Sequence, residues 1–142
     1  MLNAIHIHQI AHWLKRHHIP LLPGLLTLLI FLLYNSKVPA GAKIGKGTRL
    51  GYGGIGVVIH DRAVIGADVM IGPNVTIGGR SGHYEVPVIG DRVEISTGAK
   101  VLGPIKIGNN VIIGANAVVI KDVPDNVIVA GVPAKIIRIQ QN

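Results

Sequence analysis

The sequence predicts an all-β solenoid, a parallel β-helix of hexapeptide repeats preceded by a short helical segment. A large aliphatic residue returns at every sixth position through much of the chain, and a glycine or other small residue usually follows it. A period of six fits neither an amphipathic helix, with a period of about 3.6, nor a half-buried strand, with a period of about 2. It fits a triangular coil in which three hexads close one turn of about 18 residues. The repeating positions are Ile59, Ile65, Ile71, Ile77, Ile89, Ile95, Val101, Ile107, Ile113 and Val119.

Composition supports a narrow aliphatic prism and excludes several classes of protein. The 142 residues are 49% hydrophobic but only 4% aromatic, so Val, Ile, Leu and Ala must form the core. Without cysteine, the chain can form no disulfide, zinc–thiolate site or cysteine nucleophile, and it suits a cytoplasmic location. The net charge of +7 favours anionic partners. We expect no nucleic-acid partner, because the basic residues are scattered and lack an aromatic stacking platform.

We divide the chain into an N-terminal helical segment, residues 1–36, and a β-helix domain, residues 37–142. Residues 3–18 predict an amphipathic helix, and the residues expected on its apolar face are Ile7, Ile10, Ala11 and Leu14. The residues expected to point largely away are His8, His12, Lys15 and Arg16. No acidic residue precedes Asp61 to complete a metal site. We therefore expect no metal and interpret the local histidines as solvated, namely His6, His8, His12, His17 and His18.

A second helix is expected from about residue 23 to 34, and its sequence is apolar all round. Such a helix must be buried by something, yet it is shorter than the roughly 20 residues that span a bilayer. We expect it to pack across the open end of the prism or against neighbouring subunits. The second possibility is peripheral attachment of residues 19–34 to the inner membrane surface. A signal peptide is disfavoured because cleavage after Ala42 would cut into hexads that begin at Val38.

The hexad step fails at two places before the pattern becomes regular. Leu50 and Ile59 are nine residues apart, so a glycine-rich bulge around Tyr52 must leave the wall. Residues 78–87 lack the pattern, with His83 where an aliphatic residue is expected, and we interpret them as an extruded loop. Loops that interrupt a regular scaffold are where function concentrates.

The coil arithmetic places two distant histidines at one corner. Ile59 and Ile77 are one coil apart, so His60 should stack on Gly78 at the base of the loop that carries His83. The hexads then run unbroken from Ile89 to Val119. Residues 127–139 are expected to form a closing strand pair or tail with a bend at 131–135.

Several segments occur in a characteristic order, namely the bulge before Val57-Val58-Ile59, residues 98–104 (GAKVLGP), 113–119 (IGANAVV), 121–124 (KDVP) and 130–135 (AGVPAK). Over roughly residues 38–139 they resemble the hexapeptide-repeat acyltransferases. The greatest likeness is to serine O-acetyltransferases and related acetyltransferases of surface-polysaccharide pathways. The resemblance implies a left-handed parallel β-helix and a homotrimer with active sites between subunits. It also implies acetyl-CoA as the donor co-substrate.

The implied chemistry moves an acetyl group from a thioester to a small-molecule hydroxyl. A histidine should take the hydroxyl proton, and N–H donors should stabilise the oxyanion. The family pattern has an Asp-His pair in the bulge and a histidine before a proline in the loop. Here Gly51-Tyr52 or Tyr52-Gly53 stands in the bulge and Val86 precedes the proline. The acceptor is therefore either L-serine or a saccharide.

His83 is our first candidate for the general base, and His60 is the second candidate or a supporting residue. Tyr52, Asp61 and Arg80 are candidates for binding the acceptor. The resemblance places the pantetheine arm of acetyl-CoA along small residues and its phosphates beside basic ones. The donor candidates are Gly98, Ala99, Gly114, Ala115 and Ala117 for the arm, and Lys121, Lys135 and Arg138 for the phosphates.

Two other classes of protein stay open. The γ-class carbonic anhydrases share this type of prism but bind zinc through three histidines, and this prism offers only His60 and His83. A non-catalytic, membrane-associated scaffold would use the apolar helix and the basic charge instead.

Overall fold

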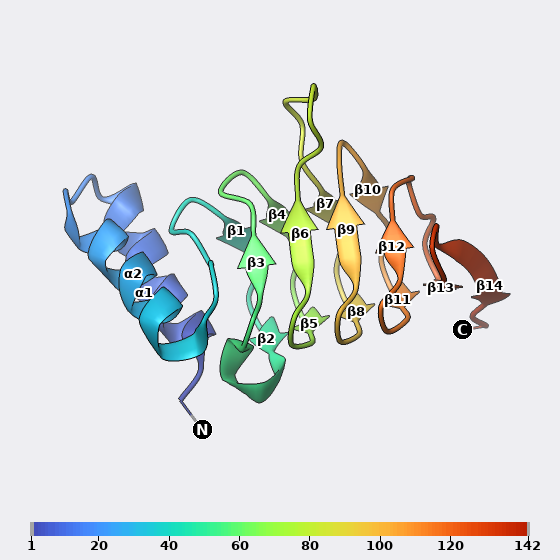
Figure 1. Ribbon diagram of the computed structural model, residues 1–142, viewed down its shortest axis with the longest axis horizontal. Helices are drawn as coiled ribbons and strands as arrows, with labels where there is room; N and C mark the ends of the chain where they lie inside the picture. The colour runs from blue at the N-terminus through green and yellow to red at the C-terminus, as the bar shows by residue number, and fades with distance from the viewer. Residues whose placement is uncertain (1, 142) are drawn as a thin grey trace.

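A computed structural model describes residues 2–141 as a left-handed parallel β-helix with two helices at one end (Figure 1), which confirms the predicted fold class. The helices are α1 (Ala4–Arg16) and α2 (Leu22–Tyr34). Sheet 1 contains β1 (Lys43–Ile44), β4 (Val64–Ile65), β7 (Val88–Ile89) and β10 (Lys106–Ile107). Sheet 2 contains β2 (Arg49–Leu50), β5 (Met70–Ile71), β8 (Glu94–Ile95), β11 (Ile112–Ile113), β13 (Val127–Ala130) and β14 (Lys135–Ile139). Sheet 3 contains β3 (Val58–Ile59), β6 (Thr76–Gly78), β9 (Lys100–Leu102) and β12 (Val118–Val119).

The repeating aliphatic residues stack inside the prism, as the six-residue period predicts. In sheet 3, Ile59 pairs with Ile77, Ile77 with Val101, and Val101 with Val119, and all four side chains are buried. Burying one such side chain contributes about 1.5–3 kcal/mol. The stacked aliphatic side chains therefore form one continuous core along the prism.

The glycine that follows many of these residues is required for close packing between coils. A Cβ atom on Gly66 would lie 2.5 Å from the Gly90 carbonyl oxygen, and a Cβ on Gly90 would lie 2.9 Å from the Gly108 carbonyl carbon. Neither Gly66 nor Gly90 has a positive φ. These glycines are therefore needed for the space between coils and not for an unusual backbone conformation. The left-handed residues near this edge are Asp68, Arg92, Asn110 and Asn126.

Helix α1 covers the first coil with a face different from the predicted one. Its buried residues are Ala4, Ile5, His8, Ala11 and Leu14, whereas Ile10 is 56% exposed. A Cβ on Gly54 in the bulge would lie 3.1 Å from the Cβ of Ala4, so helix and bulge pack closely. This contact turns His8 inward, and the prediction of solvated histidines is wrong for this residue.

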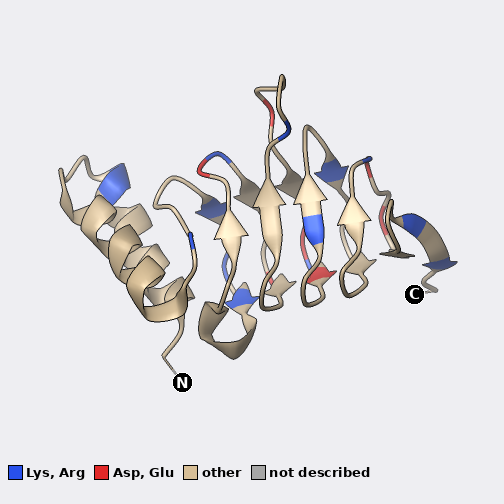
Figure 2. Cartoon of the chain, viewed as in Figure 1, with Lys and Arg blue, Asp and Glu red and all other residues tan. Residues whose placement is uncertain are grey.

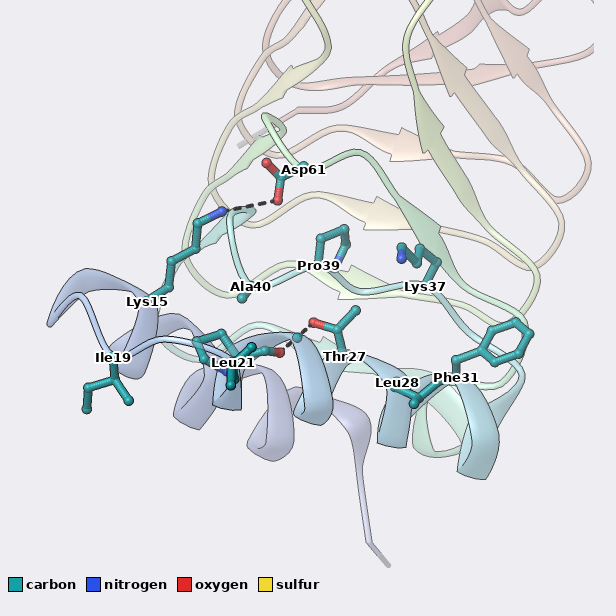
Figure 3. A pocket seen from close by; sticks show the side chains of 12 residues that line it. Lys15, Ile19, Leu21, Thr27, Leu28, Phe31, Lys37, Pro39, Ala40 and Asp61 are labelled. Carbon is teal, nitrogen blue, oxygen red and sulfur yellow. Dashed lines mark hydrogen bonds and ion pairs between the residues drawn. The ribbon is translucent and has the colours of Figure 1, made fainter.

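Helix α2 lies against α1 and buries only Pro23 and Ile30. Helix α1 packs against the bulge and the first coil, whereas most apolar side chains of α2 are exposed, so the alternative that the second helix packs against neighbouring subunits stays a prediction. An open groove of about 800 Å³ lies beside α2, with Leu28 and Phe31 on the helix side and Lys37 opposite (Figure 3). Neither helix within residues 2–141 has the length and apolar character needed to cross a membrane.

The two irregular segments lie at opposite ends of the sheet 3 strands (Figure 1): the bulge precedes β3 and the loop follows β6. The bulge contains the short 3₁₀ helix η1 (Gly51–Gly54) and connects sheet 2 to sheet 3. The loop of residues 79–87 connects sheet 3 to sheet 1 and is exposed except for Val86 and Pro87. At the far end of the prism, β13 and β14 form the expected antiparallel strand pair.

Candidate functional site

His60 lies directly after β3, at the base of the 79–87 loop. The backbone N–H of Arg62 donates a 3.1 Å hydrogen bond to its Nδ1 atom. A neutral imidazole that accepts at Nδ1 carries its proton on Nε2. A Cβ on Gly79 would lie 3.7 Å from His60 Cδ2 and 3.9 Å from Nε2, so this edge of the ring faces the loop. His60 thus presents a hydrogen-bond donor at the base of the loop.

Arg62 holds the loop from the same corner. Its guanidinium donates a 2.5 Å hydrogen bond to the carbonyl oxygen of Tyr84 and lies 4.0 Å from the centroid of the Tyr84 ring. Arg62 and Tyr84 also line a cavity of about 360 Å³ between the loop and sheet 1. One residue therefore fixes both the tautomer of His60, through its backbone, and the loop, through its side chain.

His83 lies on the exposed outer part of the loop. Its backbone N–H donates to the carbonyl oxygen of Arg80, 3.1 Å away, which closes a turn. Within residues 2–141 its imidazole makes no hydrogen bond, so both ring nitrogens are available to a substrate. His60 and His83 belong to the same corner, as the coil arithmetic predicts, but no hydrogen bond joins their rings in the described chain.

Arg80 packs against the wall at the base of the loop. A Cβ on Gly103 would lie 3.4 Å from the Cβ of Arg80, and Gly103 has a φ of 98°. A side chain at position 103 would therefore be strained and would crowd the loop.

Asp61 is directed toward the helical end of the molecule. Its Oδ1 atom accepts a 3.1 Å hydrogen bond from the N–H of Gly41 and lies 3.6 Å from Lys15 Nζ (Figure 3). These contacts connect the first coil to α1. Asp61 makes no hydrogen bond to its neighbour His60 among the residues described.

Tyr52 lies at the other edge of sheet 3, in the bulge. It adopts a left-handed conformation with φ 51° and its side chain is 74% exposed. Figure 1 shows the bulge and the 79–87 loop at opposite ends of the sheet 3 strands, the bulge before β3 and the loop after β6. A single chain therefore does not bring Tyr52 and His83 together.

The candidates for the donor arm lie in the same row of turns as the bulge, between sheets 2 and 3, but two and three coils farther from the helices. Gly98, Gly114 and Ala115 lie in the turns between sheets 2 and 3, while the side chains of Ala99 and Ala117 are 0% exposed. Both alanines, backbone included, are therefore buried in the single chain. The small size of these residues is thus needed for stacking of the coils, and it also leaves room for a ligand at the turns.

The basic donor candidates lie in two places: Figure 2 shows basic residues on β14 and in the turn that follows β12. Lys135 pairs with Ala130 at the start of β14, and a Cβ on Gly114 would lie 3.1 Å from the Cβ of Ala130. Lys135 is therefore close to the small-residue turns. Lys121 follows β12, at the end of the sheet 3 strands from which the 79–87 loop also leaves, and Arg138 lies farther along β14.

Sequence reasoning missed Arg62, although the strand register would have indicated it. Val64 pairs with Val88, a step of 24 residues, which places Arg62 across from Val86 at the end of the loop. The chain segment described by the structure contains no cluster of three His, Asp or Glu side chains suited to a metal ion.

Two family models match the prism. Residues 87–121 match the bacterial transferase hexapeptide (six repeats), and residues 68–102 match the hexapeptide repeat of succinyl-transferase. Together with the fold, these matches identify a solenoid of the hexapeptide-repeat class.

Serine acetyltransferases are among the similar curated proteins. The chain is 41% identical over 138 residues to that of Synechococcus elongatus, covering 95% of this chain and 56% of the relative. It is 38% identical over 139 residues to that of Helicobacter pylori, covering 96% of this chain and 80% of the relative. The chain belongs to the serine acetyltransferase family.

Solved structures show the same fold at similar identity. A serine acetyltransferase from Brucella abortus in complex with coenzyme A superposes with a TM-score of 0.92 at 36% identity. The match covers 97% of this chain and 56% of that structure. The chain thus spans little more than half the length of several relatives that it matches.

Proposed function

We propose that this protein is an acetyl-CoA-dependent O-acetyltransferase that acts as a homotrimer on a small-molecule hydroxyl. The observation that carries the proposal is the similarity to serine acetyltransferases over nearly the whole chain, including a structure in complex with coenzyme A. L-serine is the acceptor indicated by the names of the relatives. A saccharide is the second candidate, favoured by Tyr52 at the bulge where the family pattern has an Asp-His pair. We propose a cytoplasmic location, in keeping with a chain without cysteine.

In the proposed reaction, His83 removes the proton from the acceptor hydroxyl as its oxygen attacks the thioester carbonyl. The C–O bond forms, the C–S bond breaks, and the CoA sulfur leaves with the electron pair and is protonated. His60 acts as a hydrogen-bond donor at the base of the loop, because the Arg62 N–H occupies its Nδ1 lone pair. A fixed donor near developing negative charge lowers the barrier without reorganisation.

The separation of Tyr52 from the loop supports a trimeric site. The two features lie at opposite edges of sheet 3 in one chain. In a threefold assembly of parallel prisms, the bulge edge of one subunit would face the loop edge of its neighbour. Tyr52 of one subunit and His83 of another would then form one cleft.

The experiment that tests the proposal follows CoA release from acetyl-CoA with L-serine and with a panel of sugars. We expect turnover with at least one acceptor, and a loss of about a hundredfold or more in His83→Ala. His6→Ala, which changes an exposed histidine of α1, is the matched control and should retain turnover. Near-normal turnover in His83→Ala would remove His83 as the base.

Two substitutions separate the roles of the histidines. Glutamine can donate a hydrogen bond from its side-chain amide but cannot act as a base at neutral pH. His60→Gln should therefore retain substantially more activity than His60→Ala if His60 is a donor. Equal and severe losses in both variants would indicate that His60 is the base.

The alternative functions make different predictions. A non-catalytic scaffold would show no acetyl-CoA binding by calorimetry and would float with lipid vesicles through residues 19–34. A γ-carbonic-anhydrase-like enzyme would contain stoichiometric zinc, measurable by elemental analysis of the purified protein.

A further inference from the structure

A buried hydroxyl group fixes a regular turn of the prism. The Oγ1 atom of Thr48 donates a 2.8 Å hydrogen bond to the carbonyl oxygen of Gly66 and accepts one of 3.1 Å from the N–H of Val69. These partners lie 18 and 21 residues farther along the chain. The hydroxyl therefore joins the two ends of the turn between β4 and β5.

Ser36, a buried residue that follows α2, makes the same pair of contacts at the bulge. Its Oγ atom donates to the carbonyl oxygen of Gly54 and accepts a 3.0 Å hydrogen bond from the N–H of Val57, again 18 and 21 residues farther along. These partners therefore end a regular turn, and the bulge adds only residues 51–53 to the coil. Ser36 fixes the point at which the chain returns to the wall.

Asn3 holds the other end of the added residues. Its Nδ2 atom donates a 2.8 Å hydrogen bond to the carbonyl oxygen of Leu50, the last residue of β2, while its Oδ1 atom caps the N-terminus of α1. The ring of Tyr34 packs against the same segment, because a Cβ on Gly53 would lie 3.2 Å from its Cε1 atom. The N-terminal helical segment therefore holds residues 51–53 at both ends.

Tyr52, in the middle of these added residues, has a backbone conformation that its side chain disfavours. A residue with a Cβ atom adopts left-handed angles, here φ 51° and ψ 39°, only at a cost in free energy. The exposed ring gains little packing in return. Strained residues of this kind cluster at functional sites, where the surroundings hold them. Apart from Arg92, the left-handed positions in the coils are occupied by Asn or Asp, namely Asp68, Asn74, Asn110, Asn116 and Asn126.

We propose that Asn3 and Ser36 are positioning residues, which fix the bulge and thereby hold Tyr52 against the acceptor. The proposal rests on the acetyltransferase function and gives the N-terminal helical segment a part in acceptor binding. The bulge lies on the turn of the next coil, since a Cβ on Gly51 would lie 3.7 Å from Gly72 Cα and from Pro73 Cδ. An acceptor in contact with Tyr52 would therefore lie in the same row of turns as the proposed donor arm.

The first test measures the acceptor KM, with L-serine or whichever acceptor of the panel is acetylated, and the Kd of acetyl-CoA by calorimetry. Ser36→Ala should raise the acceptor KM about tenfold through misplacement of Tyr52 and change the acetyl-CoA Kd by less than about twofold. Thr48→Ala, the matched control, loses the same two hydrogen bonds at a turn without added residues and should keep the acceptor KM. Both variants should melt about 3–10 °C lower, because each leaves a buried N–H and carbonyl group unpaired.

A double-mutant cycle tests whether Ser36 acts through Tyr52. Residues that act on one group have non-additive effects. In a Tyr52→Ala background, Ser36→Ala should therefore raise the acceptor KM by less than about twofold more. The fall in melting temperature caused by Ser36→Ala should persist in that background, because the lost hydrogen bonds are the same.

Two further variants separate the fold from the site. Asn tolerates left-handed angles, so Tyr52→Asn should melt about 2–4 °C higher than the wild type and yet raise the acceptor KM about tenfold. Asn3→Ser keeps an oxygen that can cap α1 but is too short to reach Leu50. It should leave the helical circular dichroism unchanged and raise the acceptor KM severalfold.

Three results would overturn the proposal. An equal rise in acceptor KM in Ser36→Ala and Thr48→Ala would show a general effect of lost stability. A full tenfold effect of Ser36→Ala in the Tyr52→Ala background would show that Ser36 does not act through Tyr52. A normal acceptor KM in Tyr52→Asn would remove Tyr52 from the acceptor site. Absence of acetyl transfer by the wild type to every acceptor would instead refute the enzymatic function itself, which the other three results leave standing.

Discussion

Lowering the pH should release α1 from the prism, because α1 buries a histidine that must stay neutral. His8 is 1% exposed, and its Nδ1 atom has no hydrogen-bond partner in the described chain. Burial, and secondarily the charge of His12, lowers the pKa of His8 from 6.5 to about 4, against a smaller opposite effect of carbonyl groups of the first coil. The protonated form is thus strongly disfavoured in the folded protein.

The magnitude follows from the difference between the two pKa values. The unfolded chain takes up the proton near pH 6.5 and the folded chain only near pH 4. The stability associated with neutral His8 is therefore fully present above pH 6.5 and is lost as the pH falls toward 4. A difference of one in pKa corresponds to about 1.4 kcal/mol. The loss should reach about 2 kcal/mol at pH 5 and about 3 kcal/mol below pH 4.

The assay compares urea unfolding at pH 7.5 and pH 5, followed by the fluorescence of Trp13, the single tryptophan, which lies on α1. His8→Leu removes the titrating group, whose Nδ1 atom has no hydrogen-bond partner in the described chain, so the variant should lose about 2 kcal/mol less than the wild-type protein between the two pH values. His6→Leu changes an exposed histidine of the same helix and should behave like the wild type. An equal pH dependence in wild type and His8→Leu would refute the reasoning.

Two further predictions concern the coil edges and the loop. Gly90→Ala places a Cβ 2.4–2.9 Å from atoms of the next coil and should lower the free energy of unfolding by about 1–3 kcal/mol. Gly24→Ala, in open space on a helix, should raise the free energy of unfolding by about 0.5–1 kcal/mol. Equal effects of the two substitutions in urea unfolding would contradict the packing argument. Arg62→Gln should speed hydrogen exchange in the loop around Tyr84 and lower turnover about tenfold while leaving the core strands protected. Arg92→Gln, which loses only a surface hydrogen bond, should leave the loop unchanged, and similar loop exchange in both variants would show that Arg62 does not hold it.

The sequence predicted the prism well because its signal is strictly local and repeated. Each hexad contributes the same inward aliphatic residue, and the pairing of Ile59 with Ile77 follows from counting alone. Both departures from the count, the bulge and the 79–87 loop, also lie where the pattern failed. The sequence alone does not say why a glycine is required at a given position. Both a close approach between coils and a positive φ require glycine, and the repeat pattern does not separate the two causes.

The surroundings of the candidate site were harder to predict because they depend on how α1 docks. The amphipathic pattern placed Ile10 inside and His8 outside, and the contact of Ala4 with the bulge rotates the helix away from that arrangement. The same docking brings Lys15 to Asp61. Contacts between a helix and a solenoid have no repeat of their own, so neither the buried histidine nor the Lys15–Asp61 ion pair had a periodic signature.

The arrangement of charged and small residues along the prism suggests where the two substrates meet. The candidate donor residues lie in the third and later coils, and the 79–87 loop leaves the wall between the second and third. Since successive coils are only about 4.8 Å apart, a loop at this level can reach groups bound on either side of it. His60 lies at the base of that loop with its Nε2 edge facing Gly79. A general base on the loop and a fixed hydrogen-bond donor at its base therefore lie close to the candidate donor residues along the prism axis but at the opposite ends of the sheet 3 strands, so in the proposed trimer the acetyl donor would reach them from the bulge side of a neighbouring subunit.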